Sequence, residues 1–286
     1  MNKHIYPCLW FDHNAKEAIE FYKTIFDDVR LLQDTSMVMT FEVNGTKFMA
    51  LNGGPLYKCT PAVSYFIYCD GNNEKIDAIY KALSEEGKVI FPLAQYDWSP
   101  RYAWVEDKFG VSWQLDVESI NNAQKVVPCL LFGNENTAKV KEVMEHYMSI
   151  FSDSRVLMQM SYPEEMNQPE GALLFAQFTL NKFIINAMSS SEPLAYGISE
   201  ANSFVVECDT QEQIDHYWER LLEGGGKESQ CGWLQDRYGV WWQIVPAELP
   251  QLMSNPETIK QVSEIVMRST KFNLNELREA AGVKAK

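Results

Sequence analysis

Neutral polar side chains placed between aromatic residues are the groups of this sequence best suited to chemistry on a small molecule. In the strand-like stretch Ser64–Asp70, alternation places Ser64, Phe66 and Tyr68 on one face. The same alternation places Gln114 on one face of a second strand-like stretch. Binding by such groups depends on burial of apolar surface and on a few polar anchors. These residues are therefore predicted to line a ligand pocket.

A later part of the chain carries a corresponding set. Ser203 and Gln243 stand at the places of Ser64 and Gln114, and Trp241 lies on the same strand face as Gln243. These three residues are predicted to line a second pocket.

The segment 88–104 is much longer than its counterpart in the later set, so the two pockets are expected to differ there. It contains Trp98, Arg101 and Tyr102. These side chains could form the wall or lid of a pocket, and a packed surface loop is the alternative. The Arg101 guanidinium could pair with an anionic ligand.

The residues that usually carry catalysis form no set. His4 lies at the edge of the first predicted strand and would be a metal ligand only if that strand were shifted in register. The acidic neighbours Glu85 and Glu86 are interpreted as solvated charges. None of the six cysteines belongs to a CxxC pair, which predicts reduced thiols and a cytoplasmic protein.

Composition limits the partners. The 286 residues carry a formal charge of -14, which disfavours nucleic acid because a phosphate backbone would be repelled. No apolar run has the length of a membrane-spanning helix, and the N-terminus does not resemble a signal peptide. A membrane or nucleic-acid partner is therefore not expected.

An internal duplication positions the candidate residues. The segment Tyr102–Leu115 matches Cys231–Ile244 at six of fourteen positions, with W, D, G, V, W and Q identical. Within it, Trp113 and Trp242 alternate with the pocket positions and are predicted to be core residues.

Each repeat reads as two βαβββ modules. In the first repeat, residues 5–11 form a strand pattern and residues 15–26 an amphipathic helix, and three short strand candidates follow. Asn44-Gly45 predicts a tight hairpin between the last two of these strands. The series then restarts at residue 62. We expect an α+β fold with one domain at 1–120, a second at 125–247 and a helical tail at 248–286.

The repeat resembles the vicinal-oxygen-chelate superfamily of glyoxalases, bleomycin-resistance proteins and dioxygenases. The specific strings KEAIEFYKTIF, FMALNGGP and DKFGVSWQ/DRYGVWWQ are similar to its PhnB-like branch, often labelled 3-demethylubiquinone 3-methyltransferase-like. The resemblance covers both repeats and the tail. It implies that each repeat forms a U-shaped mixed-sheet barrel that encloses a small-molecule pocket.

The resemblance also implies where a metal would be held, on the first, fourth, fifth and eighth strands. These positions fall at Pro7 and Pro128, near Asn52 and Asn186, at Ser64 and Ser203, and at Gln114 and Gln243. Proline has no side-chain donor, and neutral amides and hydroxyls compensate little of a divalent charge. No cofactor is therefore expected. A divalent metal is the alternative, with His4, Gln114 and Gln243 as its weak candidates.

These observations predict a metal-independent protein that binds a small molecule in an aromatic-lined pocket. The alternatives are a metal-dependent lyase, isomerase or dioxygenase, a structural or regulatory module, and the methyltransferase that the family label suggests. The last is disfavoured because no glycine-rich loop follows a strand, and residues 224–226 follow a helix as a C-cap. By analogy with single-domain relatives, the duplication favours a monomer that contains an internal pseudo-dimer, with a homodimer as the alternative.

Overall fold

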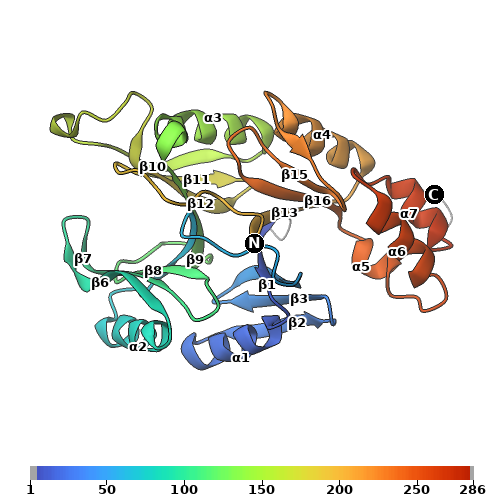
Figure 1. Cartoon of the computed structure of the whole chain (residues 1–286), viewed down its shortest axis with the longest axis horizontal. Helices are drawn as coiled ribbons and strands as arrows, with labels where there is room; N and C mark the ends of the chain where they lie inside the picture. Colours follow the sequence, from blue (N-terminus) through green and yellow to red (C-terminus); the bar gives the residue numbers. More distant parts are fainter. Residues whose placement is uncertain (1–4, 284–286) are drawn as a thin grey trace. The chain divides into compact units, whose positions relative to one another are not determined.

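The computed structural model describes residues 5–283 and contains four βαβββ modules followed by a helical tail (Figure 1). The first repeat supplies two modules. The first module comprises β1 (Ile5–Phe11), α1 (Ala15–Ile25), β2 (Val29–Asp34), β3 (Val38–Val43) and β4 (Thr46–Asn52). The second comprises β5 (Val63–Tyr68), α2 (Asn73–Ser84), β6 (Lys88–Tyr96), β7 (Ser99–Glu106) and β8 (Ser112–Asp116).

The second repeat supplies the other two modules and the tail. The third module comprises β9 (Val126–Phe132), η1 (Asn134–Lys139), α3 (Val140–Ile150), β10 (Arg155–Ser161), η2 (Glu164–Met166), β11 (Leu173–Leu180) and β12 (Phe183–Ser189). The fourth comprises β13 (Asn202–Cys208), α4 (Gln211–Leu222), β14 (Lys227–Glu228), β15 (Trp233–Gln235) and β16 (Trp241–Pro246). The tail comprises α5 (Leu249–Leu252), α6 (Ile259–Arg268) and α7 (Leu274–Ala280).

Local sequence explains the elements. The apolar positions Ala18, Ile19 and Tyr22 recur at helical spacing and are the buried stripe of α1. Asn44 and Gly45 both have positive φ and connect β3 to β4, which confirms the predicted tight hairpin.

The described chain divides into two compact units, Tyr6–Asn202 and the part from Ser203 onward, to which Ile5 also belongs. The first unit contains an eight-stranded sheet in the order β10-β11-β12-β9-β5-β8-β7-β6. Its centre is the antiparallel pair of β5 and β9. The sheet therefore joins the second module of the first repeat to the first module of the second repeat.

This pairing differs from the expectation that each repeat closes its own barrel. Modules of different repeats share one sheet because the apolar β5 finds its antiparallel partner in β9, across the linker between the repeats. The boundaries 1–120 and 125–247 thus describe the sequence duplication, whereas the compact units are divided elsewhere.

The turn before β8 has the same construction in both repeats. Asp107 accepts hydrogen bonds from the Trp113 indole at 2.8 Å, from the backbone N–H of Val111 at 3.0 Å and from the Tyr22 hydroxyl at 2.9 Å. Asp236 likewise accepts one from the Trp242 indole at 2.9 Å. Both tryptophans are fully buried, which confirms that they are core residues.

The tail helices form a core of their own in the second unit. Its buried members are Leu252, Val262, Ile265, Phe272 and Leu277. Cys231 and Val245 pack against this core from the β15–β16 region. Among the described residues, no helix is long and apolar enough to cross a membrane.

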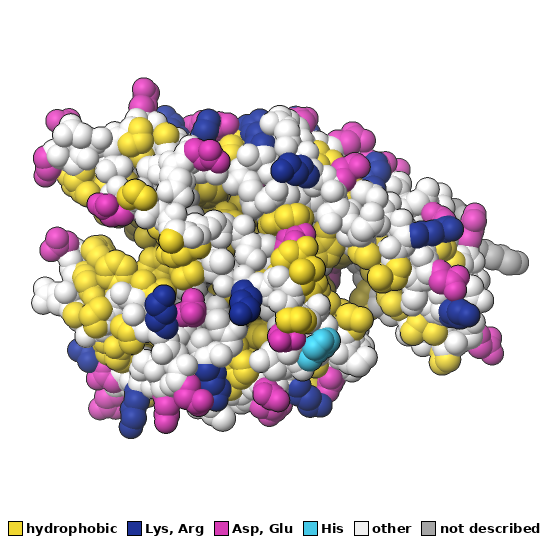
Figure 2. Space-filling model, viewed as in Figure 1, with side chains coloured by type: hydrophobic (Ala, Val, Ile, Leu, Met, Phe, Trp, Pro, Cys, Tyr) yellow, Lys and Arg dark blue, Asp and Glu magenta, His cyan; other side chains and the backbone are white. Residues whose placement is uncertain are grey.

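Helices cover one face of the eight-stranded sheet: α2 packs on β6, β7 and β8, and α3 packs on β11 and β12 (Figure 1). We call the opposite face the inner face. Figure 2, in the same view, shows a hollow between the β6–β7 hairpin and the β10–β11 arm, with apolar side chains along its walls. The inner face is therefore the place where the first unit could admit a ligand.

Candidate functional site

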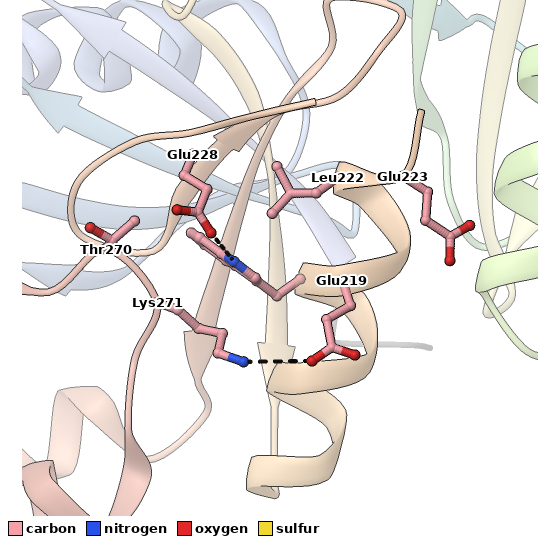
Figure 3. Close-up of a pocket in the computed structure, with 7 residues that line it drawn as sticks. Glu219, Leu222, Glu223, Glu228, Thr270 and Lys271 are labelled. Carbon is pink, nitrogen blue, oxygen red and sulfur yellow. Dashed lines mark hydrogen bonds and ion pairs between the residues drawn. The ribbon is translucent and has the colours of Figure 1, made fainter. Parts of the chain in front are cut away.

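A pocket of about 610 Å³ lies in the second unit, between α4 and the segment before α7 (Figure 3). Its polar groups are already paired: the Trp218 indole donates to Glu228 at 3.0 Å, and Lys271 forms an ion pair with Asp215 at 2.7 Å. Because these groups satisfy one another, the pocket offers a ligand few polar anchors. The inner face in the first unit is the better candidate.

Strand register decides which residues share the inner face. Ser64 of β5 pairs with Cys129 of β9, and Cys129 in turn pairs with Asn186 of β12. Paired residues on neighbouring strands point to the same side of a sheet. Ser64, Cys129 and Asn186 therefore lie in one row across three strands.

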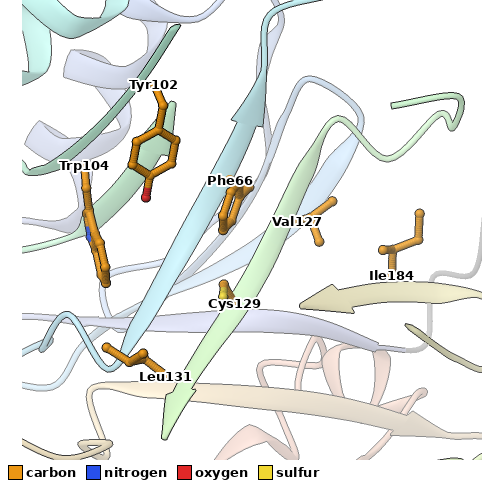
Figure 4. Close-up of a cluster of buried hydrophobic side chains, with 7 residues drawn as sticks. All are labelled: Phe66, Tyr102, Trp104, Val127, Cys129, Leu131 and Ile184. Carbon is orange, nitrogen blue, oxygen red and sulfur yellow. The ribbon is translucent and has the colours of Figure 1, made fainter. Parts of the chain in front are cut away.

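A cluster of buried apolar side chains covers the inner face around this row. Its buried members are Phe66, Tyr102, Trp104, Val127, Cys129, Leu131 and Ile184 (Figure 4). They come from four strands of both repeats, and partly buried residues such as Tyr68, Phe175 and Met188 pack against them. The inner face thus supplies a large apolar surface from both repeats.

The long β6–β7 hairpin extends this surface with exposed aromatic rings. Trp98 is 53% exposed and stacks on Tyr96 with ring centroids 4.8 Å apart. Phe91 is 37% exposed and stacks on Trp104 at 6.0 Å. Exposed large apolar side chains grouped in this way are typical of binding surfaces.

The strand β10, at the other edge of the sheet, is exposed along its whole length and carries methionines. Met158 pairs with Gln177 and Met160 pairs with Phe175, so both methionines share the inner face. Their side chains are 49% and 43% exposed. Methionine is flexible and packs well against aromatic rings. One wall of the hollow is thus rigid and aromatic, and the other is adaptable.

A chain of neutral hydrogen bonds lies on one side of Phe66. The Tyr102 hydroxyl donates to Gln114 Oε1, and Gln114 Nε2 donates to Ser64 Oγ at 2.7 Å. All three residues are buried. The Ser64 hydroxyl donates to no acceptor among residues 5–283, so the chain of donors ends at Ser64.

A second neutral group lies on the other side. Gln177 Nε2 lies 3.0 Å from Asn186 Oδ1 and 3.4 Å from the Tyr68 hydroxyl, and it donates to both. Asn186 is fully buried, yet its Nδ2 has no hydrogen-bond partner among residues 5–283. An unsatisfied buried donor costs roughly 1–3 kcal/mol.

The hydroxyl and thiol groups of the inner face are held neutral, and one buried carboxyl, Asp116, shares this face because it pairs with Tyr68 and Tyr102. Burial raises the pKa of Tyr68 to about 12, against an opposing effect of the Asn186 and Gln177 amides. Burial also raises the pKa of the Tyr102 hydroxyl and of the Cys129 thiol. The apolar cluster therefore presents hydroxyl, amide and thiol groups without charge near neutral pH.

The structure brings five of the predicted pocket residues onto the inner face and places others elsewhere. Ser64, Phe66, Tyr68, Tyr102 and Gln114 lie on it, and Trp98 lies at its rim.

Arg101 does not join them, because alternation along β7 turns its side chain toward α2. Its guanidinium pairs with Asp77, with Nε at 3.0 Å. The suggested role in binding an anion therefore finds no support in this geometry.

The predicted residues of the second repeat lie in the second unit. Gln243 Nε2 donates to Ser203 Oγ at 2.9 Å, and Trp241 packs edge-on against Trp233 at 6.5 Å. This pair repeats the hydrogen bond between Gln114 and Ser64. His4 lies outside the described residues.

The strand register corrects two of the expected metal positions. Pro128 pairs with Tyr65, which packs against Trp113 on the helix side, so Cys129 occupies the inner-face position of the first strand. In the first repeat, the residue that corresponds to Asn186 is Met49, which pairs with Cys8.

Asn52 has a different role. It lies at the end of β4, where its Oδ1 accepts from the backbone N–H of Ala15 at 3.0 Å and its Nδ2 donates to the Ser36 carbonyl at 3.0 Å. Its side chain thus fastens the start of α1.

The donors on the inner face fit a divalent metal poorly. They are the Ser64 hydroxyl, the Gln114 and Asn186 amides, the Cys129 thiol, whose raised pKa keeps it protonated, and a single carboxyl, Asp116, which already accepts from Ser99 at 2.8 Å. Gln114 Oε1 already accepts from Tyr102. Across residues 5–283, no three His, Cys, Asp or Glu side chains gather as a metal would require.

Sequence reasoning missed the residues that the second repeat contributes. Cys129, Gln177 and Ile184 reach the inner face only because β9 pairs with β5. A signal existed in the apolar strand 126–132, which is buried at every position and therefore needs cover on both faces.

Comparison with known families identifies both repeats. The family model described as 3-demethylubiquinone-9 3-methyltransferase matches residues 3–116 and 124–245. The PhnB protein of Bacillus cereus, described under the same methyltransferase name, is 31% identical over 39% of this chain and 96% of its own, with a TM-score of 0.37. A search of curated proteins found no match.

The fold is also that of a glyoxalase. Glyoxalase I from Zea mays matches 88% of this chain and 97% of its own chain with a TM-score of 0.57 and 12% identity. At this identity the likeness concerns the fold alone.

Proposed function

The chain belongs to the 3-demethylubiquinone-9 3-methyltransferase family, and on that premise we propose that it binds a small apolar or aromatic molecule on the inner face without a metal. The observation that carries the proposal is the apolar cluster around Phe66, extended by exposed aromatic rings on one side and methionines on the other. Large apolar surfaces in a hollow, with few polar groups, are typical of small-molecule sites.

The chemistry of the polar groups supports a site without metal. Ser64, Gln114 and Tyr102 bond one another, and the raised pKa of Cys129 disfavours its thiolate form. A neutral donor set orients a ligand by hydrogen bonds and leaves apolar burial as the main source of affinity.

The methyltransferase name finds no counterpart in the glycines of this chain. Gly224 and Gly225 have positive φ and follow the end of α4, where they reverse the chain toward β14. A glycine-rich phosphate- or nucleoside-binding loop would instead follow a strand and open a helix. Ligand binding is therefore the better-supported function.

Two variants of β5, each with a shortened side chain, test the proposal. Phe66→Val and Ile67→Val both introduce the residue found at the same place in the second repeat, Val205 and Val206. Phe66 lies in the inner-face cluster, whereas Ile67 is fully buried on the helix side. We expect Phe66→Val to weaken binding of naphthalene about tenfold and Ile67→Val to leave it unchanged.

Binding is measured by quenching of tryptophan fluorescence and by the ligand-induced rise in Tm. Equal weakening by both variants would assign the effect to general loss of packing. If neither naphthalene nor any member of a panel of neutral aromatic compounds stabilises the wild-type protein, the proposal is wrong.

A further inference from the structure

The Nδ2 group of Asn186 is an unused donor within the inner face. Asn186 is fully buried on β12, and its Oδ1 is occupied by Gln177. Its Nδ2 completes no hydrogen bond of acceptable geometry with the described residues, although it lies near the Tyr68 hydroxyl, whose pKa it lowers. Buried donors without a partner are rare in folded proteins, and one that faces a binding surface calls for an explanation.

The position of the Asn186 Nδ2 group relative to the apolar cluster supplies this explanation. Asn186 pairs with Cys129, and Ile184, two residues earlier on the same strand, belongs to the apolar cluster. The Ser64 hydroxyl lies on the other side of Cys129 in the same row. Two neutral donors therefore flank an apolar floor.

The same strand position differs in the first repeat, where Met49 stands at the place of Asn186. A methionine side chain fills this place in β4 without any buried amide. The strand fold therefore does not require an amide here, and Asn186 is free to serve a ligand.

Resting on the proposed function, we propose that the ligand is a neutral, planar aromatic molecule with a carbonyl or other acceptor group, and that Asn186 Nδ2 donates to this acceptor. The raised pKa of Tyr68 agrees with a site that keeps its own groups uncharged. An anionic group placed against this apolar cluster would lose its hydration.

Three probes of similar size separate the contributions: naphthalene, 2-acetylnaphthalene and 2-naphthoate. In the wild-type protein we expect 2-acetylnaphthalene to bind about tenfold more tightly than naphthalene, and 2-naphthoate to bind most weakly. Asn186→Met should reduce the affinity for 2-acetylnaphthalene to that for naphthalene. Ile185→Val, on the opposite face of β12, is the matched control and should keep the preference.

The outcomes are distinguishable. Equal binding of naphthalene and 2-acetylnaphthalene by the wild-type protein would overturn the role of Asn186 and leave the proposed function intact. Preferred binding of 2-naphthoate would overturn the neutral ligand class. Absence of binding by all three probes would overturn both proposals. Asn186→Met should also raise Tm in the absence of probe, because the variant removes an unsatisfied donor, and this rise shows that it folds.

Discussion

The strands β5–β8 and their counterparts β13–β16 share a skeleton but differ in what covers it. Both contain the aspartate-centred turn, the buried tryptophan and the hydrogen bond from glutamine to serine. In β5–β8, Tyr102 and the long β6–β7 hairpin add an aromatic surface. In β13–β16 the hairpin is short, and Cys231, at the place of Tyr102, packs against the tail.

The difference separates structure from function. Because the pair of serine and glutamine occurs in both regions, it is explained as a structural bond between neighbouring strands. The aromatic hairpin has no counterpart in β13–β16, and the first repeat has a methionine at the place of Asn186. These two features are therefore the ones on which selection for a ligand could have acted. In β13–β16, the tail helices cover the apolar surface. In β5–β8, the apolar surface beside the hairpin stays exposed.

The largest effect is expected from Phe272→Ala. Phe272 is 1% exposed, and its ring lies against Gly232 in the tail core. Loss of this ring should lower the free energy of unfolding of the second unit by about 3–5 kcal/mol, measured by urea titration. Met267→Ala, at a residue 69% exposed, is the control. Loss of naphthalene binding under conditions where the variant is folded would contradict the separation of the two regions.

Asp107→Asn tests whether the shared turn is structural. The carboxylate accepts from Trp113, Tyr22 and two backbone N–H groups, and an amide cannot accept from all of them. We expect a loss of about 2–3 kcal/mol, with a comparable loss for Asp236→Asn, measured by chemical denaturation. Asp97→Asn, on the exposed hairpin turn, should be neutral. A large loss in only one repeat would break the comparison.

Trp98→Ala tests whether the hairpin binds or merely packs. Because Trp98 is half exposed, stability should change by no more than about 0.5 kcal/mol. Affinity for 2-acetylnaphthalene should fall by about fivefold, since one aromatic wall is lost. Calorimetric titration measures the affinity. A large loss of stability with unchanged affinity would favour the packed surface loop.

The smallest effect is expected from pH. Because the pKa values of Tyr68, Tyr102 and Cys129 are raised, affinity should stay constant between about pH 6 and 9. The raised pKa of Tyr68 means that the folded state holds its proton more tightly than the unfolded state does. The resulting stabilisation is complete below pH about 10 and is lost as pH rises through about 12. Tyr68→Phe should remove that part of alkaline unfolding, and an affinity that varies near neutral pH would implicate another group.

Much of the architecture could be predicted from the sequence because repeats and periodicity are local signals. The hairpin at Asn44-Gly45, the helix pattern of residues 15–26 and the buried Trp113 follow from neighbouring residues. The pairing of β5 with β9 could not be read in this way, because strand partners are chosen by packing between distant segments.

The site was predictable only in part for the same reason. Ser64, Phe66 and Gln114 were found by alternation within the first repeat. Asn186 was assigned as a metal position by resemblance, and its role as a free donor depends on its neighbours Gln177 and Cys129. Arg101 was suggested for binding because an exposed cation near a pocket resembles an anchor, but its partner Asp77 lies on a helix 24 residues earlier.

The sheet shared between repeats also bears on synthesis of the chain. Strand β5 reaches the end of the ribosomal tunnel before β9, its partner at the centre of the sheet, has been translated. At typical translation rates of roughly 5–20 residues per second, several seconds pass between the synthesis of β5 and that of β9. During that time an apolar strand edge and the aromatic face of Phe66 are uncovered in the nascent chain. The protein should therefore depend on holding chaperones during translation more than a protein with two independently folding repeats would.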